Sequence, residues 1–305
     1  MAETKTESKN YLDPHVLDRI KRLELRARMV VEGFITGMHR SPFNGFAIEF
    51  AGHREYSPGD ELKHIDWKVW SKTDRFYIKE YEEETNLKCT VVVDSSKSMA
   101  YGEPGWSKFD YAATAAASLA HLLQQQQDSV GLVTFSTKVT NNLPASSRSN
   151  HLRLMVHTLD EMSPDDKTDV ADVFVELAGQ IRQRGIVAIF SDLFVDEETL
   201  KEALQQFRLR RHDVILFHIM HSDELGFPFD ENTRFIGLED VEDEIEADPR
   251  ALQQAYLDEV EKYLEFIRKT CASIGVDYRL VNANEPLDAV LAEFLAFRKQ
   301  TTRKS

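Results

Sequence analysis

Residues 91–98 read VVVDSSKS: three valines in a row, followed directly by a carboxylate and hydroxyls at alternate positions. A run this short and this apolar is typical of a strand that is covered on both faces of a sheet. The polar residues mark the point where the strand ends and a loop begins. The stretch therefore predicts a buried strand with oxygen-bearing side chains at its carboxyl end.

Further apolar runs of the same kind predict the rest of a sheet, with helices between them. The runs are 130–135, 186–190, 214–219 and 276–281, and the helices are 107–126, 170–182 and 198–209. The first helix starts with a capping box made by Ser107 and Asp110. The alternation of strands and helices predicts an α/β fold with a doubly wound, mainly parallel sheet. Residues 139–143 follow the preceding strand so closely that we expect an antiparallel edge strand there.

Oxygen-bearing side chains come together at one edge of this predicted sheet. In an open parallel sheet, ligands gather in the crevice at the carboxyl ends of the strands. Asp94, Ser96 and Ser98 follow the first strand, Asp192 follows a later one, and Thr168 precedes a helix. A hard divalent cation such as Mg²⁺ takes about six oxygens and keeps some of its waters, so few charged ligands suffice. The sequence therefore predicts an Mg²⁺ site, or an Mn²⁺ site, at these five residues.

The order and spacing of the same residues resemble the metal-ion-dependent adhesion site of von Willebrand factor A domains. The resemblance implies that Ser96, Ser98 and Thr168 ligate the metal directly. It implies that Asp94 and Asp192 hold the waters of the metal. One coordination position would then stay open for a carboxylate of a protein partner.

The chain departs from that family just before the threonine. Glycines are common there, whereas residues 165–167 read DDK. Asp169 therefore stands as an alternative ligand to Thr168. A simpler interpretation of the first loop also stays open, because Asp94, Ser96 and Ser98 are residue types that favour turns and helix caps without binding any ligand.

A hydrolytic role for Asp94 is the main alternative function. Haloacid-dehalogenase enzymes also place a nucleophilic aspartate after the first strand of such a sheet, and they follow it with a second acid. Here the second position is Ser96, which cannot act as a general acid or base at neutral pH. Motifs of other hydrolases, NTPases and dehydrogenases do not occur in the chain. We therefore predict a non-enzymatic protein, with a metal-dependent hydrolase or phosphatase that uses Asp94 or an N-terminal histidine cluster as the alternative.

The N-terminal part has a different texture and predicts a separate module. A helix with one apolar stripe is predicted from Pro14 to Gly33. Residues 46–81 carry short aromatic and β-branched segments around a turn, which predicts a small β-rich module. An acidic run then ends at Glu84. The predicted domains are residues 1–84, with the helix and the β-rich module, and residues 85–305, with the α/β fold.

This N-terminal part, continuing into the first strand and its loop, resembles the family catalogued as domain of unknown function 58. The matching segments are 37–41, 45, 49–50, 54–56, 59–60, 65–67, 78–80 and 94–99. Together with the von Willebrand factor A-like domain, the resemblance covers nearly the whole chain. Members of that family are often encoded beside MoxR-type AAA+ ATPases. The resemblance thus implies an accessory or adaptor that meets such an ATPase, or its protein client, in the cytoplasm.

Charge and composition narrow the range of partners. With 52 acidic and 37 basic side chains, the net charge is −15, which repels nucleic acid and anionic membranes at long range. No run approaches the ~20 apolar residues that span a bilayer, and the first residues lack an apolar signal core. The two cysteines, Cys89 and Cys271, cannot build a disulfide framework and are expected in the core. We therefore expect a cytoplasmic protein with no integral membrane segment and no nucleic-acid partner.

Three further features have structural interpretations. Potential zinc ligands are His39, His53, His64 and Asp66. Their irregular spacing favours hydrogen-bonded or exposed histidines over a zinc site. Residues 239–248 contain seven carboxylates and are expected to form a solvated loop, with a contact to a basic partner or an adventitious cation site as the alternative. A helix is predicted from Pro249 to the residue before Gly275, with an apolar stripe that packs on the sheet.

Overall fold

The computed structural model describes most of the chain, in two compact units. The described residues are 14–17, 20, 22–40, 50–55, 69–70, 76–81, 87–164, 170–181, 184–195, 197–229, 233–236, 244–247 and 249–302. One unit comprises residues 1–35 and 87–305, and the other comprises residues 36–86. The predicted boundary residue Glu84 lies outside the described residues, so the division into 1–84 and 85–305 stays a prediction.

A six-stranded sheet forms the centre of the larger unit. Its strands, in spatial order, are β12 (Asp277–Asn282), β9 (Asp213–Met220), β8 (Ile186–Ser191), β3 (Lys88–Asp94), β6 (Ser129–Phe135) and β7 (Val139–Ser146). All neighbouring strands are parallel except β6 and β7, which are antiparallel. The predicted doubly wound, mainly parallel sheet is confirmed, and so is its antiparallel edge strand. The central strand β3 pairs with β6 on one side and β8 on the other, which explains why its valines are fully buried.

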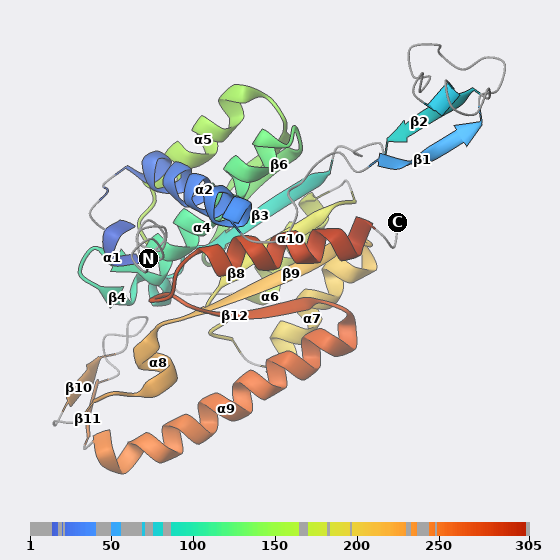
Figure 1. Cartoon of the computed structure of the whole chain (residues 1–305). Coiled ribbons are helices and arrows are strands. Elements are labelled where there is room, and N and C mark those ends of the chain that lie inside the picture. The colour runs from blue at the N-terminus through green and yellow to red at the C-terminus, as the bar shows by residue number, and fades with distance from the viewer. Residues whose placement is uncertain are drawn as a thin grey trace. The chain divides into compact units, whose positions relative to one another are not determined.

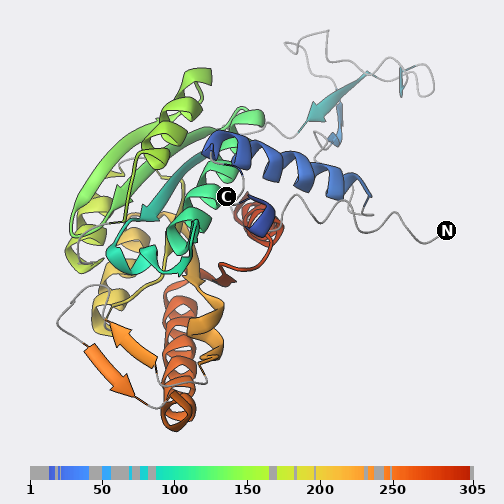
Figure 2. The ribbon, with the colours of Figure 1, turned by 90° about the vertical axis from the view of Figure 1, so that its left-hand side faces the viewer.

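Helices cover both faces of this sheet (Figure 1; Figure 2). They are α4 (Lys108–Gln125), α5 (Ser149–Asp160), α6 (Val170–Gln180), α7 (Glu197–Leu209), α9 (Pro249–Ile274) and α10 (Asp288–Thr302). Helices α4 and α10 contact each other and the sheet, and α6, α7 and the end of α9 build the core cluster with the other face. The predicted capping box of α4 is present, since Ser107 accepts from the backbone of Asp110 and the Asp110 carboxylate accepts from the backbone of Ser107. Helices α5 and α10 lie outside the segments for which the sequence predicted helices.

The N-terminal helix differs from the prediction. Two helices, α1 (Pro14–Leu17) and α2 (Leu23–Arg40), replace the single expected one, with Ile20 outside both. Gly33 lies inside α2 rather than at its end. An isolated glycine costs a helix only about 1 kcal/mol, and the apolar stripe continues beyond it to Phe34, which is buried. Leu23, Ala27 and Val30 of the stripe are buried as expected, and Arg26 beside them stacks on the ring of Trp106, 5.6 Å from its centroid.

The smaller unit contains the predicted β structure. Strands β1 (Phe50–Glu55) and β2 (Tyr77–Tyr81) form an antiparallel pair. Trp70 stacks on Phe76, with their ring centroids 5.9 Å apart. The turn expected between residues 57 and 60 lies outside the described residues.

The structure between β9 and β12 differs from the sequence-based prediction in two ways. It contains α8 (Ser222–Gly226), β10 (Thr233–Ile236) and β11 (Glu244–Ala247) before α9. The expected loop at 239–248 is wrong in part, because β11 pairs with β10. Apolar and acidic residues alternate in β11, and this period of two favours a strand despite the charge. Only the second half of α9 packs as predicted: Ile267 is buried, whereas Leu252 is 42% exposed.

Candidate functional site

Asp94 and Asp192 lie where the order in which the chain visits the strands reverses its direction across the sheet. After β3 the chain continues to β6 on one side, whereas β8 leads to β9 on the other side. Ligand crevices of open parallel sheets form at such switch points. Asp94 is the last residue of β3, Ser191 is the last residue of β8, and the Ser191 hydroxyl donates to Asp94 Oδ2 at 2.6 Å. The two strand ends are thereby joined by a buried hydrogen bond.

The loop after β3 turns its hydroxyl groups toward each other. Ser96 N donates to Asp94 Oδ1 at 2.9 Å, and the hydroxyl oxygens of Ser96 and Ser98 lie 3.1 Å apart. Ser96 precedes the short 3₁₀ helix η3 (Lys97–Ala100), but its side chain makes no capping hydrogen bond. The Ser96 hydroxyl thus faces the Ser98 hydroxyl instead of capping η3, whereas Asp94 accepts from the Ser96 backbone as in a turn. Ser95, by contrast, donates to the Phe135 carbonyl and ties β3 to β6.

A buried lysine that the sequence analysis did not single out reaches this site. Lys108 Nζ donates to Asp192 Oδ2 at 2.8 Å and to Glu224 Oε1 at 2.7 Å. The other oxygen of Asp192, Oδ1, is buried and has no hydrogen-bond partner within the described residues. A cation in the first turn of a helix is unfavourable to the helix dipole, and this was the one sequence signal that Lys108 is placed for another reason.

Burial and charge shift the proton affinities of the site. Burial, and then the carboxylate of Asp192, raise the pKa of Asp94 to about 7, although hydrogen bonds from Ser191 and Ser96 oppose the shift. Burial lowers the pKa of the Lys108 ammonium, but the carboxylates of Asp192 and Glu224 outweigh burial and leave this pKa raised. The site thus holds a charged lysine and a carboxyl group, that of Asp94, whose negative charge is poorly compensated.

The loop that carries Asp192 is held from two sides. His218 Nε2 donates to the Asp192 carbonyl at 2.9 Å, and burial lowers the pKa of His218 to about 4, so the ring is neutral at pH 7. The Tyr263 hydroxyl, on α9, bridges the carbonyls of Leu193 and Val195 at 2.5 and 2.9 Å. Leu193 has a left-handed backbone with φ of 53°. Phe194, between the two bridged carbonyls, is 74% exposed.

Four of the five predicted metal-site residues are brought together: Asp94, Ser96, Ser98 and Asp192. Thr168 and its alternative Asp169 lie outside the described residues. Within the described part of the chain, no group of three or more His, Cys, Asp and Glu side chains could hold a metal ion. The side chains of the potential zinc ligands at 39, 53, 64 and 66 lie outside the described residues. A cation at the sheet edge would therefore depend on hydroxyl oxygens as well as carboxylates.

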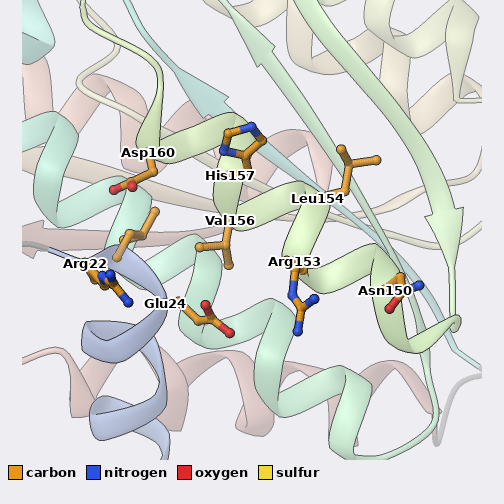
Figure 3. Close-up of a pocket in the computed structure, with 9 residues that line it drawn as sticks. Arg22, Glu24, Asn150, Arg153, Leu154, Val156, His157 and Asp160 are labelled. Carbon is orange, nitrogen blue, oxygen red and sulfur yellow. The ribbon is translucent and has the colours of Figure 1, made fainter.

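A groove of about 510 Å³ lies between the start of α2 and helix α5. Arg22, Glu24, Arg153 and His157 line it together with apolar side chains. Glu24 lies between the arginine side chains, so that basic and acidic groups alternate around the groove (Figure 3). None of the residues at the sheet edge lines it, and its mixed charge favours no class of ligand.

The strand order and the antiparallel edge strand define a doubly wound α/β protein with a polar cluster at its switch point. The chain belongs to the family described as "Protein of unknown function DUF58", which matches residues 52–263. The uncharacterized proteins Rv1480 of Mycobacterium tuberculosis and Mb1516 of Mycobacterium bovis are 23% identical to it over 295 residues, which is 94% of this chain and 91% of each relative.

Solved structures with a similar fold include proteins of several kinds. An aerotolerance-related membrane protein from Bacteroides fragilis is 18% identical, with a TM-score of 0.48 over 70% of this chain and 99% of its own. BatB from Bacteroides thetaiotaomicron is 17% identical, with a TM-score of 0.46 over the same shares of the two chains. The SpRpn10 VWA domain is 13% identical, with a TM-score of 0.40 over 68% of this chain and 95% of its own. In the part of this chain that the structure describes, no helix is both long and apolar enough to cross a membrane.

Proposed function

We propose that this protein is a non-enzymatic interaction module in which a divalent cation, Mg²⁺ or Mn²⁺, receives a carboxylate from a protein partner at the sheet edge. The observation that carries the proposal is the buried Asp192 Oδ1, which has no partner among the described residues, close to Asp94 with its raised pKa. Buried carboxylates need a counter-ion or hydrogen bonds. A cation at this edge would give Asp192 Oδ1 a partner and would stabilise the negative charge of Asp94.

The donor set fits a hard cation. Mg²⁺ and Mn²⁺ favour carboxylate, hydroxyl and water oxygens. The hydroxyls of Ser96 and Ser98 would ligate the cation directly, with Thr168 or Asp169 completing the set, while Asp94 and Asp192 would hold its waters. The bound cation would supply a positive charge that a carboxylate oxygen of the partner coordinates. Asp94 keeps the loop in place through the backbone of Ser96.

An exposed aromatic side chain extends the proposed contact surface. Phe194 follows Asp192 by two residues, and Tyr263 fixes the backbone on both sides of it. Aromatic side chains held out rigidly at low entropic cost are frequent anchors of protein interfaces. We therefore expect the partner to place an apolar surface against Phe194 next to the carboxylate that meets the metal.

The proposed partner is a MoxR-type AAA+ ATPase or its protein client. The family resemblance motivates this identity, whereas the residues motivate only the chemistry of the contact. A net charge of −15 opposes an acidic partner, and a bound cation reverses the field locally. A hydrolase that uses Asp94 has less support, because among the described residues the groups that donate to this carboxylate are the Ser96 backbone and the Ser191 hydroxyl rather than a second acid.

Calorimetric titration of the full chain with Mg²⁺ and Mn²⁺ tests the metal site. Ser96→Ala with Ser98→Ala should abolish binding, and with it the stabilisation of about 2.7 kcal/mol that a metal at a hundred times its Kd provides. Ser147→Ala with Ser149→Ala is the matched control, because these serines have the same spacing and are exposed. Equal metal binding by both double variants would refute the assignment.

Co-purification with the ATPase tests the partner. Binding should require Mg²⁺, and it should be lost with excess chelator and in the Ser96→Ala, Ser98→Ala variant. Equal binding under all three conditions would refute a metal bridge while leaving an adaptor role. No binding under any condition would remove this ATPase as the partner.

A further inference from the structure

A buried ammonium group shares a carboxylate with the proposed metal site. Lys108 is 2% exposed, and its side chain ends between Asp192 Oδ2 and Glu224 Oε1. Asp192 therefore has one oxygen bound to a fixed cation and the other, Oδ1, buried without a partner. The helix does not require this lysine, since Ser107 and Asp110 already cap α4.

We propose that Lys108 is a built-in competitor of the divalent cation, and that its sharing between Asp192 and Glu224 sets the metal affinity of the site. The inference rests on the proposed function. A metal held by Asp192, directly or through water, would share that carboxylate with the ammonium. Like charges repel strongly where side chains are buried. Lys108 thus weakens metal binding and keeps Asp192 partly neutralised when no metal is bound.

Glu224 acts in the opposite direction. Its Oε1 accepts from Lys108, and its Oε2 accepts from the backbone nitrogen of His221 at 2.7 Å, which fixes the carboxylate at the start of α8. Glu224 therefore draws part of the ammonium charge away from Asp192. Without Glu224, the ammonium would interact with Asp192 alone and compete more effectively with a metal.

Two single substitutions should then shift metal affinity in opposite directions. Lys108→Met removes the competing charge, and we expect Mn²⁺ to bind about tenfold more tightly or better. Glu224→Gln removes one of the two carboxylates that Lys108 contacts, so that the ammonium interacts mainly with Asp192. We expect this variant to bind Mn²⁺ about tenfold more weakly. A glutamine oxygen can still accept from His221, so the α8 cap is kept. Lys108→Arg retains the charge and should stay within about threefold of the wild type.

The experiment is calorimetric titration of the full chain with Mn²⁺ alone, at one pH and one ionic strength, after circular dichroism has confirmed that each variant is folded. Damage to the structure lowers metal affinity in both variants, so tighter binding by Lys108→Met cannot arise from a purely structural role. If Lys108→Met does not fold, Lys108→Gln takes its place and retains a polar group for the two carboxylates.

Tighter Mn²⁺ binding by Lys108→Met together with weaker binding by Glu224→Gln supports the competition, and the reverse pair of shifts contradicts it. Metal binding by Lys108→Met when the wild type binds none supports it as well, since the ammonium then excludes the metal entirely. Shifts in the same direction, or none, with a wild type that binds Mn²⁺ overturn the inference and leave the proposed function standing. No Mn²⁺ binding by any variant, the wild type included, overturns both.

Discussion

Replacing Asp94 with asparagine should stabilise the metal-free protein at neutral and alkaline pH. Asp94 is fully buried, and burial together with the charge of Asp192 raises its pKa from 3.8 to about 7. Asparagine has nearly the same shape and carries no charge. Its oxygen can still accept from Ser96 N, and the hydrogen bond from the Ser191 hydroxyl is altered.

The sign and size of the effect follow from proton binding. Below pH about 4, Asp94 is protonated in both the folded and the unfolded protein. Between pH about 4 and 7 the unfolded chain releases this proton and the folded chain keeps it, so the free energy of unfolding of the wild type falls as the pH rises. Above pH about 7 the loss is complete. Three pKa units at about 1.4 kcal/mol each give at most about 4 kcal/mol.

The altered Ser191 hydrogen bond should cost the variant about 1 kcal/mol. Asp94→Asn should therefore be more stable than the wild type by up to about 3 kcal/mol at pH 8, and the advantage should nearly vanish at pH 5. Urea denaturation in chelator across this pH range measures the difference. The control is Asp258→Asn on the exposed side of α9, which should change the free energy of unfolding by less than about 0.5 kcal/mol. A variant that is less stable than the wild type at pH 8, or a difference that does not change with pH, would refute the reasoning.

Three further substitutions probe the surroundings of the site. Lys108→Met in chelator should lower the free energy of unfolding by about 3–5 kcal/mol, because Asp192 and Glu224 lose their buried counter-ion; unchanged stability in urea would contradict a buried ion pair. Phe194→Ala should change stability by less than about 0.5 kcal/mol and weaken co-purification with the ATPase without altering Mn²⁺ affinity; undiminished co-purification would remove Phe194 from the contact surface. Tyr263→Phe should cost about 1–2 kcal/mol in thermal denaturation, since its hydroxyl bridges two carbonyls of the Asp192 loop, and a smaller loss would show that water replaces it.

The central sheet could be predicted because a strand that is buried on both faces has a short, continuous apolar run in the sequence. Strand β3 is apolar along the run 91–93, and the polar residues begin where the strand ends. The same logic placed Asp94 and Asp192 at one edge, since parallel strands end on the same side. Strand β11 has no such run, because acidic side chains alternate with its apolar ones. This alternation is difficult to recognise within a segment that contains seven carboxylates.

The charged neighbours of the site, Lys108 and Glu224, could not be predicted from the sequence. Lys108 lies 84 positions before Asp192 and 116 before Glu224, so no local pattern connects them. Its place in the first turn of a helix opposes the helix dipole, but this signal does not identify the carboxylates that it contacts. Only the docking of α4 and α8 at the strand ends brings the three charges together. The hydrogen bond from Ser191 to Asp94 likewise depends on the pairing of β3 with β8.

The two cysteines of the chain allow the local unfolding of its larger unit to be measured by thiol labelling. Both thiols are buried, Cys89 in the central strand and Cys271 in α9, and burial raises the pKa of Cys271 to about 12 and that of Cys89 still further above its usual range. Maleimides react with thiolates, so the folded protein should remain unlabelled on the timescale of an ordinary coupling reaction. A single new cysteine on the surface can then carry a fluorophore without removal of the native ones. Slow labelling of the native thiols would in turn measure how often the sheet and α9 come apart.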